Sequence, residues 1–458
     1  MVFSSIIFIY YFLPLLLIVY YACPKKYRNL VLLLFSLCFY FYGEKNYIFL
    51  LLGSCLFNYL VGLIVDKKKD KKYLIIGLIV NLGLLGYFKY TNFFIDNFNS
   101  IFNLSISSLN VILPLGISFF TFQNISYIVD VYKGDVKAQT NFLSYSTYIT
   151  FFPQLVAGPI VRYKDINDEL ADRKESYSLF SEGITRLLVG LGKKVLIANT
   201  LYGMCQSIES MAPSTLGYWL LGIGYTLNIY FDFSGYSDMA IGLGKMFGFN
   251  FLENFNYPLI ATSITDFWRR WHMSLSSFFR DYVYIPLGGN RVSFVKMLRN
   301  IFVVWLLTGF WHGASWNFIF WGLYFFVFLM FEKLFLLKHL KNNGIGRVYT
   351  FIIVVISFII FNTTDLSRLG EILKGMFGIN TPFMNFEFTY YLKNYLVILI
   401  IAFIGMTPIV NKLLEKLKKG KNSWIISALE IFGFLIILVL VTASLISNSF
   451  NPFIYFRF

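Results

Sequence analysis

The sequence is poor in charged residues, in histidine and in cysteine. Charged side chains make up 14% of the 458 residues, against about 25% in an average soluble domain. A soluble fold of this length needs more polar surface. This shortage therefore excludes an ordinary cytosolic enzyme, a disordered chain and a secreted disulfide scaffold. Hydrophobic residues make up 57% of the chain and aromatic residues 20%, so the composition predicts a polytopic membrane protein.

The charges and cysteines that are present also limit the function. The net charge of +15 comes from short clusters of Lys and Arg between apolar runs, which is typical of cytoplasmic loops and not of a nucleic-acid-binding face. The four cysteines are scattered through apolar segments, without a CxxC pair or a Cys/His cluster. We therefore predict no nucleic-acid partner, no metal site, no disulfide framework and no bound cofactor.

Apolar runs with the length of a spanning helix recur along the whole chain. Three further runs, 111–131, 216–249 and 301–331, are interrupted by polar residues or glycine. We expect an all-α protein with about eleven crossings and several half-helices. No linker or composition shift is visible, which favours one membrane domain over 1–458. The uninterrupted candidates are 3–22, 29–43, 46–65, 73–90, 143–161, 178–200, 348–362, 391–410 and 424–446.

The distribution of Lys and Arg predicts the orientation. The positive-inside rule places loops rich in these residues in the cytoplasm. The segment 3–22 lacks a basic n-region and a cleavage site, so we interpret it as a retained helix. Both termini then face outward, while the loop 162–177 mixes both signs and its side stays open. The loops rich in Lys and Arg are 24–28, 66–72, 338–347 and 411–421.

His312 lies in a long stretch without formal charge. No Asp, Glu, Lys or Arg occurs from Ile301 to Phe331, and glycines near the middle predict a helix, a break and a second helix. Since His312 follows Asn300 by twelve residues, it would stand about 18 Å along a regular helix, near mid-bilayer. A neutral imidazole at that depth can act as a general base. The alternative is a histidine hydrogen-bonded inside a helix bundle.

The segment 262–283 has the pattern of one amphipathic helix, with Trp and Phe on one face and Arg on the other. Ser263 and Asp266 have the spacing of an N-terminal cap, and His272 falls on the apolar face. One interpretation is an interfacial helix with a hydrogen-bonded histidine. The other is an entry site for an anionic donor, with arginines binding its phosphates. The candidates for phosphate binding are Arg269, Arg270 and Arg280.

Two carboxylates, Asp232 and Asp238, lie in an apolar stretch on either side of Ser234 and Gly235. Paired carboxylates within a membrane can relay protons or bind ions. They can also cap half-helices. We favour capping, because Ser-Gly between them predicts a helix break with free backbone donors.

Motifs along the chain resemble those of the membrane-bound O-acyltransferase (MBOAT) family, in the branch typified by alginate O-acetylation membrane proteins. The resemblance covers essentially the whole chain, without departure at the key positions. The tail NPFIYFRF (451–458) is also similar to that branch. The motifs are PLGISFFTFQNISYIVDVY (114–132), FFPQLVAGPIVRY (151–163), IYFDFSGYSDMAIGLGKMFGF (229–249), ENFNYP (253–258), SITDFWRRWHMSLSSFFRDYVYIPLGGNR (263–291) and GFWHGASWNFIFWGLY (309–324).

The resemblance implies the MBOAT fold, with half-helices and interfacial helices around a central tunnel. It implies that His312 is the essential histidine of the family and that His272 is its second, supporting histidine. The implied donor is a cytoplasmic acyl thioester, first of all acetyl-CoA. The implied partner is an SGNH-type esterase-like protein that completes transfer to a cell-envelope polysaccharide at the bacterial cytoplasmic membrane. The alternative within the family is D-alanyl transfer from a carrier protein to teichoic acid.

An acyl transfer at the helix break needs more than a base. His312 would take the proton of a hydroxyl as its oxygen attacks the thioester carbonyl. The resulting oxyanion then needs hydrogen-bond donors. Candidates near the break, which the sequence does not rank, are Trp311, Trp316, Asn317 and backbone N–H groups.

Tyr455 lies in the tail predicted to be outside. A tyrosine hydroxyl accepts an acyl group once a base removes its proton, and the resemblance adds that a C-terminal Tyr motif recurs in this branch. We expect Tyr455 to relay the acyl group to the partner, or else to anchor the tail at the membrane interface.

Two other function classes stay open. A lipid-linked sugar transporter or flippase would show two related halves, which are not seen here, and a scaffold would not need His312.

Overall fold

The computed structural model describes residues 1–156, 158–211, 213–340, 344–420 and 423–447. Every regular element within these ranges is a helix, which confirms the all-α prediction. Helices suit a chain in lipid, because each backbone N–H and C=O finds its partner within the same segment. The helices before residue 210 are α1 (Leu13–Ala22), α2 (Arg28–Glu44), α3 (Tyr47–Lys68), α4 (Lys71–Leu85), α5 (Thr91–Phe102), α6 (Ile117–Lys133), α7 (Phe142–Thr150), α8 (Phe152–Leu155), α9 (Tyr163–Ala171), α10 (Tyr177–Leu191) and α11 (Asn199–Glu209). The later helices are α12 (Thr215–Met246), α13 (Ile264–Arg270), α14 (Met273–Phe279), α15 (Phe294–His312), α16 (Trp316–Phe331), α17 (Gly344–Asn362), α18 (Leu366–Met376), α19 (Phe386–Asn394), α20 (Leu396–Gly405), α21 (Ile409–Lys418) and α22 (Ser423–Ser447).

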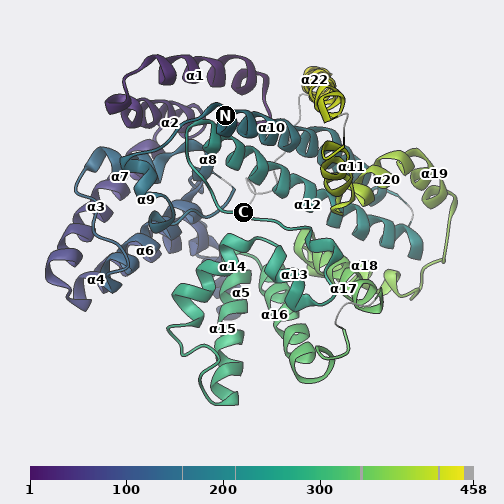
Figure 1. The fold of residues 1–458 in the computed structure, drawn as a ribbon. Helices are drawn as coiled ribbons and strands as arrows, with labels where there is room; N and C mark the ends of the chain where they lie inside the picture. Colours follow the sequence, from purple (N-terminus) through teal and green to yellow (C-terminus); the bar gives the residue numbers. More distant parts are fainter. Residues whose placement is uncertain (157, 212, 341–343, 421–422, 448–458) are drawn as a thin grey trace. The chain divides into compact units, whose positions relative to one another are not determined.

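Contacts within the chain separate two compact units that are interleaved in sequence. The first comprises Met1–Leu187 and Ser237–Glu253, and the second comprises Leu188–Tyr236 and the chain from Asn254 onward. The helices α10 and α12, labelled in Figure 1, contribute residues to both units. His272 and His312 both belong to the second unit.

Six helices among the described residues are long and apolar enough to cross a membrane, and one bent pair raises the number to seven. The bent pair is α19 with α20, which meet at 61°. The expected count of about eleven is not confirmed, because other apolar segments, such as Phe8–Ala22, are shorter than a full span. The six are Tyr47–Lys68, Lys71–Phe102, Phe294–His312, Trp316–Leu336, Gly344–Asn362 and Ser423–Ser447.

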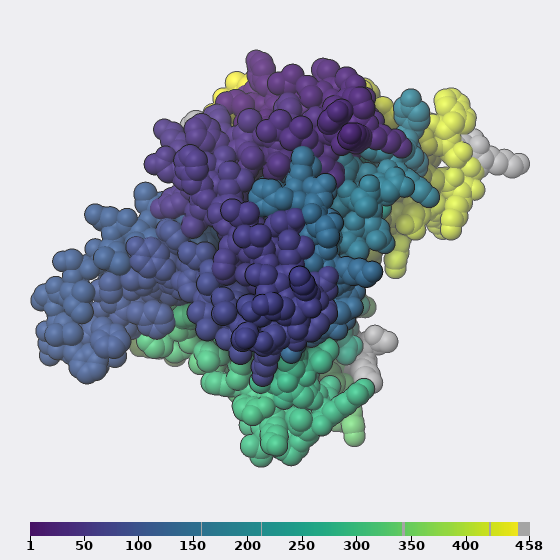
Figure 2. Space-filling view, turned by 90° about the vertical axis from the view of Figure 1, so that its left-hand side faces the viewer, coloured from purple at the N-terminus to yellow at the C-terminus, as the bar shows by residue number. Residues whose placement is uncertain are grey.

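The first unit exposes large apolar side chains on its helices. Figure 2 shows the surface of the segments before residue 150, in purple and blue. Tyr11, Phe49, Ile79 and Ile101 on these helices are each at least 64% exposed. An apolar surface of this kind is typical of a face that contacts lipid chains, because the exposure of so much apolar area to water is unfavourable.

α12 is continuous, which corrects the predicted break at Ser234 and Gly235. Its 32 residues form one α-helix. Gly235 lies at a close helix contact, where an added Cβ would stand 2.9 Å from the carbonyl oxygen of Gly190 in α10. The glycine therefore allows two helices to approach each other, and it does not end a helix.

α15 and α16 form a hairpin whose break lies where the sequence predicts it. α15 ends at His312 and α16 begins at Trp316, and the two helices lie side by side in Figure 1. An added Cβ on Gly309 would stand 2.3 Å from a backbone oxygen of α16, and one on Gly322 would stand 2.4 Å from a backbone oxygen of α15. These two glycines make the close packing of the hairpin possible.

Candidate active site

His312 is the last residue of α15 and is 3% exposed. Aromatic rings surround it: the ring centroids of Trp311, Trp321 and Phe361 lie 5.0, 5.0 and 5.2 Å from the centroid of the imidazole. Trp321 belongs to α16 and Phe361 to α17, so three helices position the side chain. α15 begins at Phe294, whereas the charge-free stretch in the sequence begins only at Ile301. The location of His312 at a helix break is as predicted.

The predicted helix over 262–283 is interrupted at His272, which corrects the expectation of one continuous amphipathic helix. α13 ends at Arg270 and α14 begins at Met273. Between them His272 has a left-handed backbone conformation with φ 44°. Residues other than glycine seldom adopt this conformation, which costs roughly 1–3 kcal/mol. His272 is also fully buried, so it does not lie on the surface of an interfacial helix.

Asn254 fixes the orientation of the His272 ring. The side-chain oxygen of Asn254 accepts hydrogen bonds from the backbone N–H and the hydroxyl of Ser274, at 3.2 and 2.9 Å. The Nδ1 atom of His272 lies 3.1 Å from the same oxygen. Because this oxygen is an acceptor, Nδ1 is the protonated nitrogen of the ring. In the neutral ring Nε2 then carries a lone pair, and it has no hydrogen-bond partner among the described residues.

The burial of His272 also sets its charge. Burial lowers the pKa of His272 to about 3, because the imidazolium would lose its hydration. The ring is therefore neutral at pH 7. A group with so low a pKa is a poor general base at that pH.

Trp311 joins the two histidines into one site. Its ring centroid lies 5.0 Å from that of His312 and 5.9 Å from that of His272. On another side of His272, Phe233 from α12 packs edge-on with its centroid 4.6 Å away. Two imidazoles that are far apart in the sequence thus meet around one indole.

Asn317 is not available as an oxyanion donor, which corrects one of the predicted candidates. The side chain is fully buried. Its Nδ2 atom donates to the carbonyl oxygens of Ile360 and Phe361 at 3.3 and 2.8 Å. These carbonyls belong to the last turn of α17, where a helix leaves them without partners of its own. The amide of Asn317 therefore caps the C-terminal end of α17.

The indoles near the break differ in burial. Trp316 is 46% exposed and its ring lies beside Phe320, so it is a poor candidate for a buried oxyanion. Trp321, which the sequence pattern did not single out, is 1% exposed, and its ring contacts His312. Its indole N–H has no hydrogen-bond partner among the described residues. A buried donor of this kind costs free energy unless a ligand accepts from it. Helical spacing was the available signal, since Trp321 follows Asn317 by one turn on the same face.

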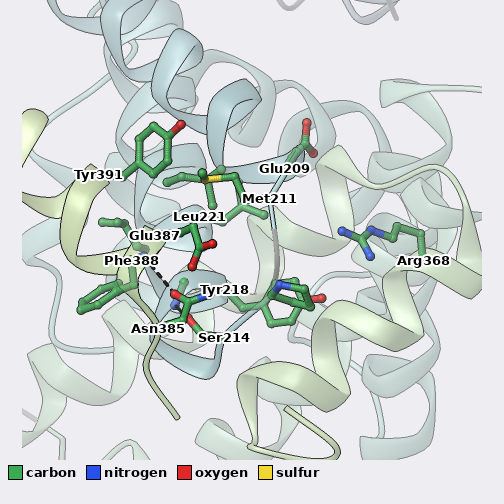
Figure 3. Close-up of a pocket in the computed structure, with 14 residues that line it drawn as sticks. Glu209, Met211, Ser214, Tyr218, Leu221, Arg368, Asn385, Glu387, Phe388 and Tyr391 are labelled. Carbon is green, nitrogen blue, oxygen red and sulfur yellow. Dashed lines mark hydrogen bonds between the residues drawn. The ribbon is translucent and has the colours of Figure 1, made fainter. Parts of the chain in front are cut away.

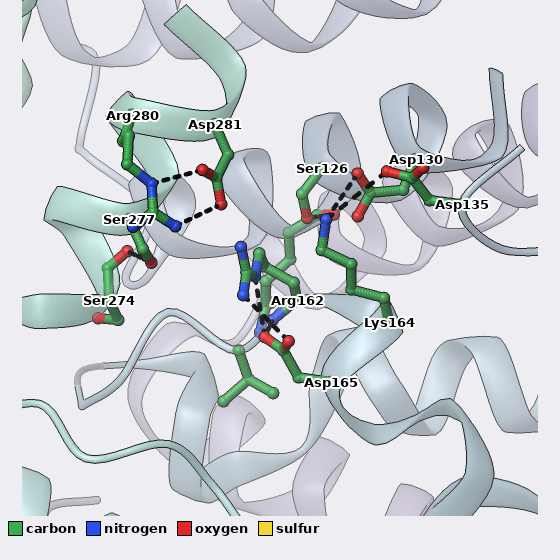
Figure 4. A network of polar contacts seen from close by, with 12 residues as sticks. Ser126, Asp130, Asp135, Arg162, Lys164, Asp165, Ser274, Ser277, Arg280 and Asp281 are labelled. Carbon is green, nitrogen blue, oxygen red and sulfur yellow. Dashed lines mark hydrogen bonds and ion pairs between the residues drawn. The ribbon is translucent and has the colours of Figure 1, made fainter. Parts of the chain in front are cut away.

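The predicted phosphate-binding arginines are engaged to different degrees. Arg270 donates to Asp266 at 2.9 Å. Arg280 donates to both carboxylate oxygens of Asp281, at 2.7 and 3.1 Å (Figure 4). Arg269 is exposed. Since two of the three already pair with a carboxylate, binding of a donor phosphate by these residues stays a prediction.

Asp232 and Asp238 form ion pairs, which corrects the prediction that they cap half-helices. Asp232 pairs with Lys194, and both side chains are at most 2% exposed. Lys194 lies in the π-helical segment Gly192–Ala198. Asp238 pairs with Arg186 at 2.7 Å. The middle of a continuous helix offers no free N–H groups to cap, and buried carboxylates need a compensating partner.

Glu332, a carboxylate that the sequence pattern also did not single out, holds the start of α13. It is fully buried and accepts hydrogen bonds from the backbone N–H groups of Ile264 and Thr265, at 2.5 and 3.0 Å. The hydroxyl of Ser263 accepts from the N–H of Asp266 at 3.0 Å, which confirms the predicted cap. The first turn of the helix that leads to the second histidine is thereby fixed.

Other predictions fall beyond what the structure tests. Tyr455 lies outside the described residues. The sides assigned to the loops and termini also stay predictions. Among the described residues, no three His, Cys, Asp or Glu side chains are grouped so that they could hold a metal ion.

Comparison with known proteins identifies the family of the chain. Residues 136–363 match the model of the membrane-bound O-acyltransferase family. The chain is 39% identical to a probable alginate O-acetylase of Pseudomonas putida, over 100% of both proteins. It is 44% identical to a probable alginate O-acetylase of Pseudomonas aeruginosa, covering 83% of this chain and 76% of that protein. It is 38% identical to a peptidoglycan O-acetyltransferase of Helicobacter pylori, covering 83% of this chain and 80% of that protein.

Proposed function

The chain belongs to the membrane-bound O-acyltransferase family and is a multi-pass O-acyltransferase, and we propose that it O-acetylates a cell-envelope polysaccharide at the bacterial cytoplasmic membrane. Relatives named for alginate and peptidoglycan O-acetylation support this class of acceptor. The donor is a cytoplasmic acyl thioester, specifically acetyl-CoA. The acetyl group passes outward, where an SGNH-type partner completes its transfer.

The observation that carries the proposal is the meeting of two buried imidazoles around Trp311. His312 stands at a helix break among rings, beside the buried indole N–H of Trp321. A site of this kind combines a base with a hydrogen-bond donor in surroundings that exclude water. These are the groups that acyl transfer to a hydroxyl requires.

The chemistry assigns one step to each group. His312 takes the proton of the acceptor hydroxyl while the hydroxyl oxygen attacks the thioester carbonyl carbon. The oxyanion that forms accepts a hydrogen bond from the indole N–H of Trp321. When the C–S bond breaks, the imidazolium returns the proton to the departing thiolate. One thioester and one hydroxyl thus give one ester and one free thiol.

His272 has a supporting role in this mechanism. Its low pKa makes it a poor base at pH 7. Its Nε2 lone pair, held in place by Asn254, can accept a hydrogen bond from a substrate N–H or O–H. This arrangement suits the positioning of a substrate, and His312 is left as the base.

The outward step uses the tail. Tyr455 accepts the acetyl group as an ester on its hydroxyl and passes it to the partner. Tyr455→Phe keeps the ring and removes only the hydroxyl. We expect it to lose polysaccharide O-acetylation while thioester hydrolysis persists. Full O-acetylation by this variant would instead support an anchoring role for the tail.

The proposed function is tested by the choice of donor. Purified full-length protein in liposomes is given acetyl-CoA or a D-alanyl carrier-protein thioester, each with a soluble oligosaccharide acceptor, and free thiol is measured. We expect thiol release from acetyl-CoA. Release from the D-alanyl thioester alone would favour teichoic acid D-alanylation. No release from either donor, together with movement of a lipid-linked sugar across the liposome membrane, would support a transporter and overturn the proposal.

A further inference from the structure

α21 (Ile409–Lys418) is an amphipathic helix with an exposed apolar face. Five large apolar residues recur at helical spacing and share one side of it: Ile409, Val410, Leu413, Leu414 and Leu417. Among them Ile409 is 59% exposed and Leu413 is 54% exposed, and no residue of the helix is buried by the described chain. An apolar face of this kind indicates a partner other than water.

The two helices before α21 pack against the core of the second unit, whereas α21 does not. Phe388 and Tyr391 of α19 line a small pocket together with residues of α11 and α12 (Figure 3). Leu399 and Ala402 of α20 are 4% and 0% exposed. No residue of α21 belongs to this core among the described residues. The position of α21 therefore depends on other contacts.

Lysines accompany the apolar face of α21. From Ile409 to Gly420 the chain has four lysines and one carboxylate. Lys418 pairs with Glu430 of α22 at 2.6 Å, whereas the side chains of Lys412, Lys416 and Lys419 are exposed. A lysine-rich polar face opposite an apolar face is typical of a helix that lies in the interface of a membrane.

The loop that contains most of α21 is predicted to be cytoplasmic, since 411–421 is one of the loops rich in lysine. The cytoplasmic leaflet has a negative surface potential, which attracts basic segments close to the membrane. Acyl chains suit the apolar face of the helix, and anionic headgroups suit its lysines. Both features therefore favour one partner, the anionic lipids of that leaflet.

A side-chain hydrogen bond connects α21 to the surroundings of His272. The Nδ2 atom of Asn411 donates to the hydroxyl oxygen of Tyr257 at 2.7 Å. Tyr257 is the last residue of the segment 254–257, which contains Asn254 and which we call the His272 strap. Its backbone is left-handed, with φ 46°. A residue other than glycine keeps this conformation only where contacts hold it, and Asn411 supplies one of them.

The His272 strap runs beside the helix break that contains His272. The backbone N–H of Asn256 donates to the carbonyl oxygen of Arg270 at 2.9 Å, and the N–H of Met273 donates to that of Asn254 at 3.0 Å. Arg270 and Met273 lie on either side of the break, so the strap supports both of its ends. A contact that fixes Tyr257 therefore also restricts the movement of His272.

We propose that α21 binds anionic lipids of the cytoplasmic leaflet and that the bound helix holds the His272 strap through Asn411. The apolar face of α21 lies among acyl chains, and Lys412 and Lys416 contact lipid phosphates. Asn411 and Tyr257 are then positioning residues for His272. The lipid site goes beyond the proposed function and does not depend on which donor or acceptor the enzyme uses.

The first test measures lipid retention by native mass spectrometry. The purified full-length protein is held in micelles that contain equal amounts of phosphatidylcholine and phosphatidylglycerol, and we expect it to retain phosphatidylglycerol preferentially. Each lysine near an anionic surface contributes about fivefold, so Lys412→Gln with Lys416→Gln should lower the preference by about 25-fold. Lys374→Gln with Lys393→Gln, which removes two exposed lysines from α18 and α19, is the matched control and should behave as the wild type does.

The second test measures hydrogen–deuterium exchange of residues 254–273 in nanodiscs of phosphatidylcholine, with or without phosphatidylglycerol. We expect exchange in the wild type to be about fivefold slower with phosphatidylglycerol, which is the effect of about one hydrogen bond. Asn411→Ala and Tyr257→Phe should each lose this difference while still retaining the lipid. Asn394→Ala, which changes an exposed amide on α19, is the control and should keep the difference.

The two parts of the proposal can be overturned separately. Equal retention of both lipids by the wild type, or equal losses in the two double lysine variants, would overturn the lipid site. Exchange that does not respond to phosphatidylglycerol in the wild type, or that still responds in Asn411→Ala, would overturn the connection to His272. If Leu413→Gln changed the oligomeric state without affecting lipid retention, a second copy would cover the apolar face and the proposal would be wrong. Neither readout uses acetyl-CoA, so a failure of the proposed function would not alter them.

Discussion

His312 and His272 are both buried and both lie at a helix end, yet they are held in different ways. His312 closes a helix of 19 residues and is surrounded by three aromatic rings. His272 separates two helices of seven residues each and has a left-handed backbone. Its ring is tied to Asn254 at 3.1 Å. This hydrogen bond fixes the tautomer of the His272 ring.

The difference between the surroundings of His312 and His272 shows how one site can use two imidazoles. A ring with Nδ1 held protonated and with a low pKa presents the same lone pair at every pH near neutrality, which suits the positioning of a substrate. A base must instead gain and lose a proton in each cycle. We therefore infer that His312 performs the proton transfer and that His272 holds a substrate.

The largest expected effect separates the two histidines directly. His312→Gln keeps a polar side chain of similar size but removes the base, and we expect O-acetylation to fall by about 1,000-fold. The same substitution at His272 removes one hydrogen-bond acceptor and should lower O-acetylation by only about tenfold. The readout is the O-acetyl content of the envelope polysaccharide in cells with matched protein levels. If His312→Gln cells kept most of their O-acetylation, the assignment of His312 as the base would be wrong.

The next effect concerns the support behind His272. Asp232 precedes Phe233, whose ring packs on His272, and it pairs with the buried Lys194. Asp232→Asn leaves that lysine without its carboxylate and should cost about 3 kcal/mol of stability, measured as a lower melting temperature. The double variant Lys194→Met with Asp232→Leu removes both charges and should recover most of the loss. An unchanged melting temperature in the single variant would show that the pair contributes nothing.

A somewhat smaller effect tests the oxyanion donor beside His312. Trp321→Phe keeps an aromatic ring and removes the indole N–H, and we expect the rate of acetyl transfer to fall by about 100-fold. Trp268→Phe is the matched control, because Trp268 is also buried with an indole N–H that has no partner among the described residues. Equal losses in the two variants, measured as thiol release, would mean that Trp321 has no special role.

The smallest effect tests the tautomer of His272. Asn254→Asp keeps the shape of the acceptor but adds a negative charge, which raises the pKa of His272. The ring then becomes charged near neutral pH and Nε2 loses its lone pair. We expect the variant to be about threefold slower than the wild type at pH 7 and to recover as the pH rises. Identical pH profiles of thiol release in the two proteins would contradict the assigned tautomer.

The low pKa of His272 in the wild type also predicts how the stability of the protein depends on pH. In the folded protein the pKa of His272 lies near 3, below its ordinary value of 6.5. As the pH falls below 6.5, the unfolded chain takes up a proton that the folded chain does not, so the free energy of unfolding falls between pH 6.5 and pH 3. Above pH 6.5 this contribution is constant. Melting curves of the wild type and of His272→Gln should therefore diverge only below that pH.

The sequence alone located the break at His312 but not the break at His272. The stretch around His312 is too long for one span and contains glycines, and both features are visible in the sequence. The segment around His272 keeps helical spacing of its Trp and Phe residues on both sides of the break, so the pattern indicated one helix. A left-handed histidine is held by tertiary contacts, here Asn254, and local propensity does not encode it.

The partners of buried polar groups also could not be predicted from the sequence. Asp232 pairs with a lysine from another helix, and the donors of Asn317 bind the end of α17. Both contacts depend on how helices pack. The cap formed by Ser263 was predictable because its partner lies three residues away. Local hydrogen bonds could therefore be predicted, and long-range ones could not.

One measurement tests the central claim most directly, namely that His312 is the base of an acetyl transfer. Free thiol released from acetyl-CoA is measured with purified wild-type, His312→Gln and His272→Gln proteins, in the presence of an acceptor oligosaccharide and with melting temperatures checked. We predict no release above background from His312→Gln and reduced but clear release from His272→Gln. Release at the wild-type rate by folded His312→Gln protein would contradict the claim.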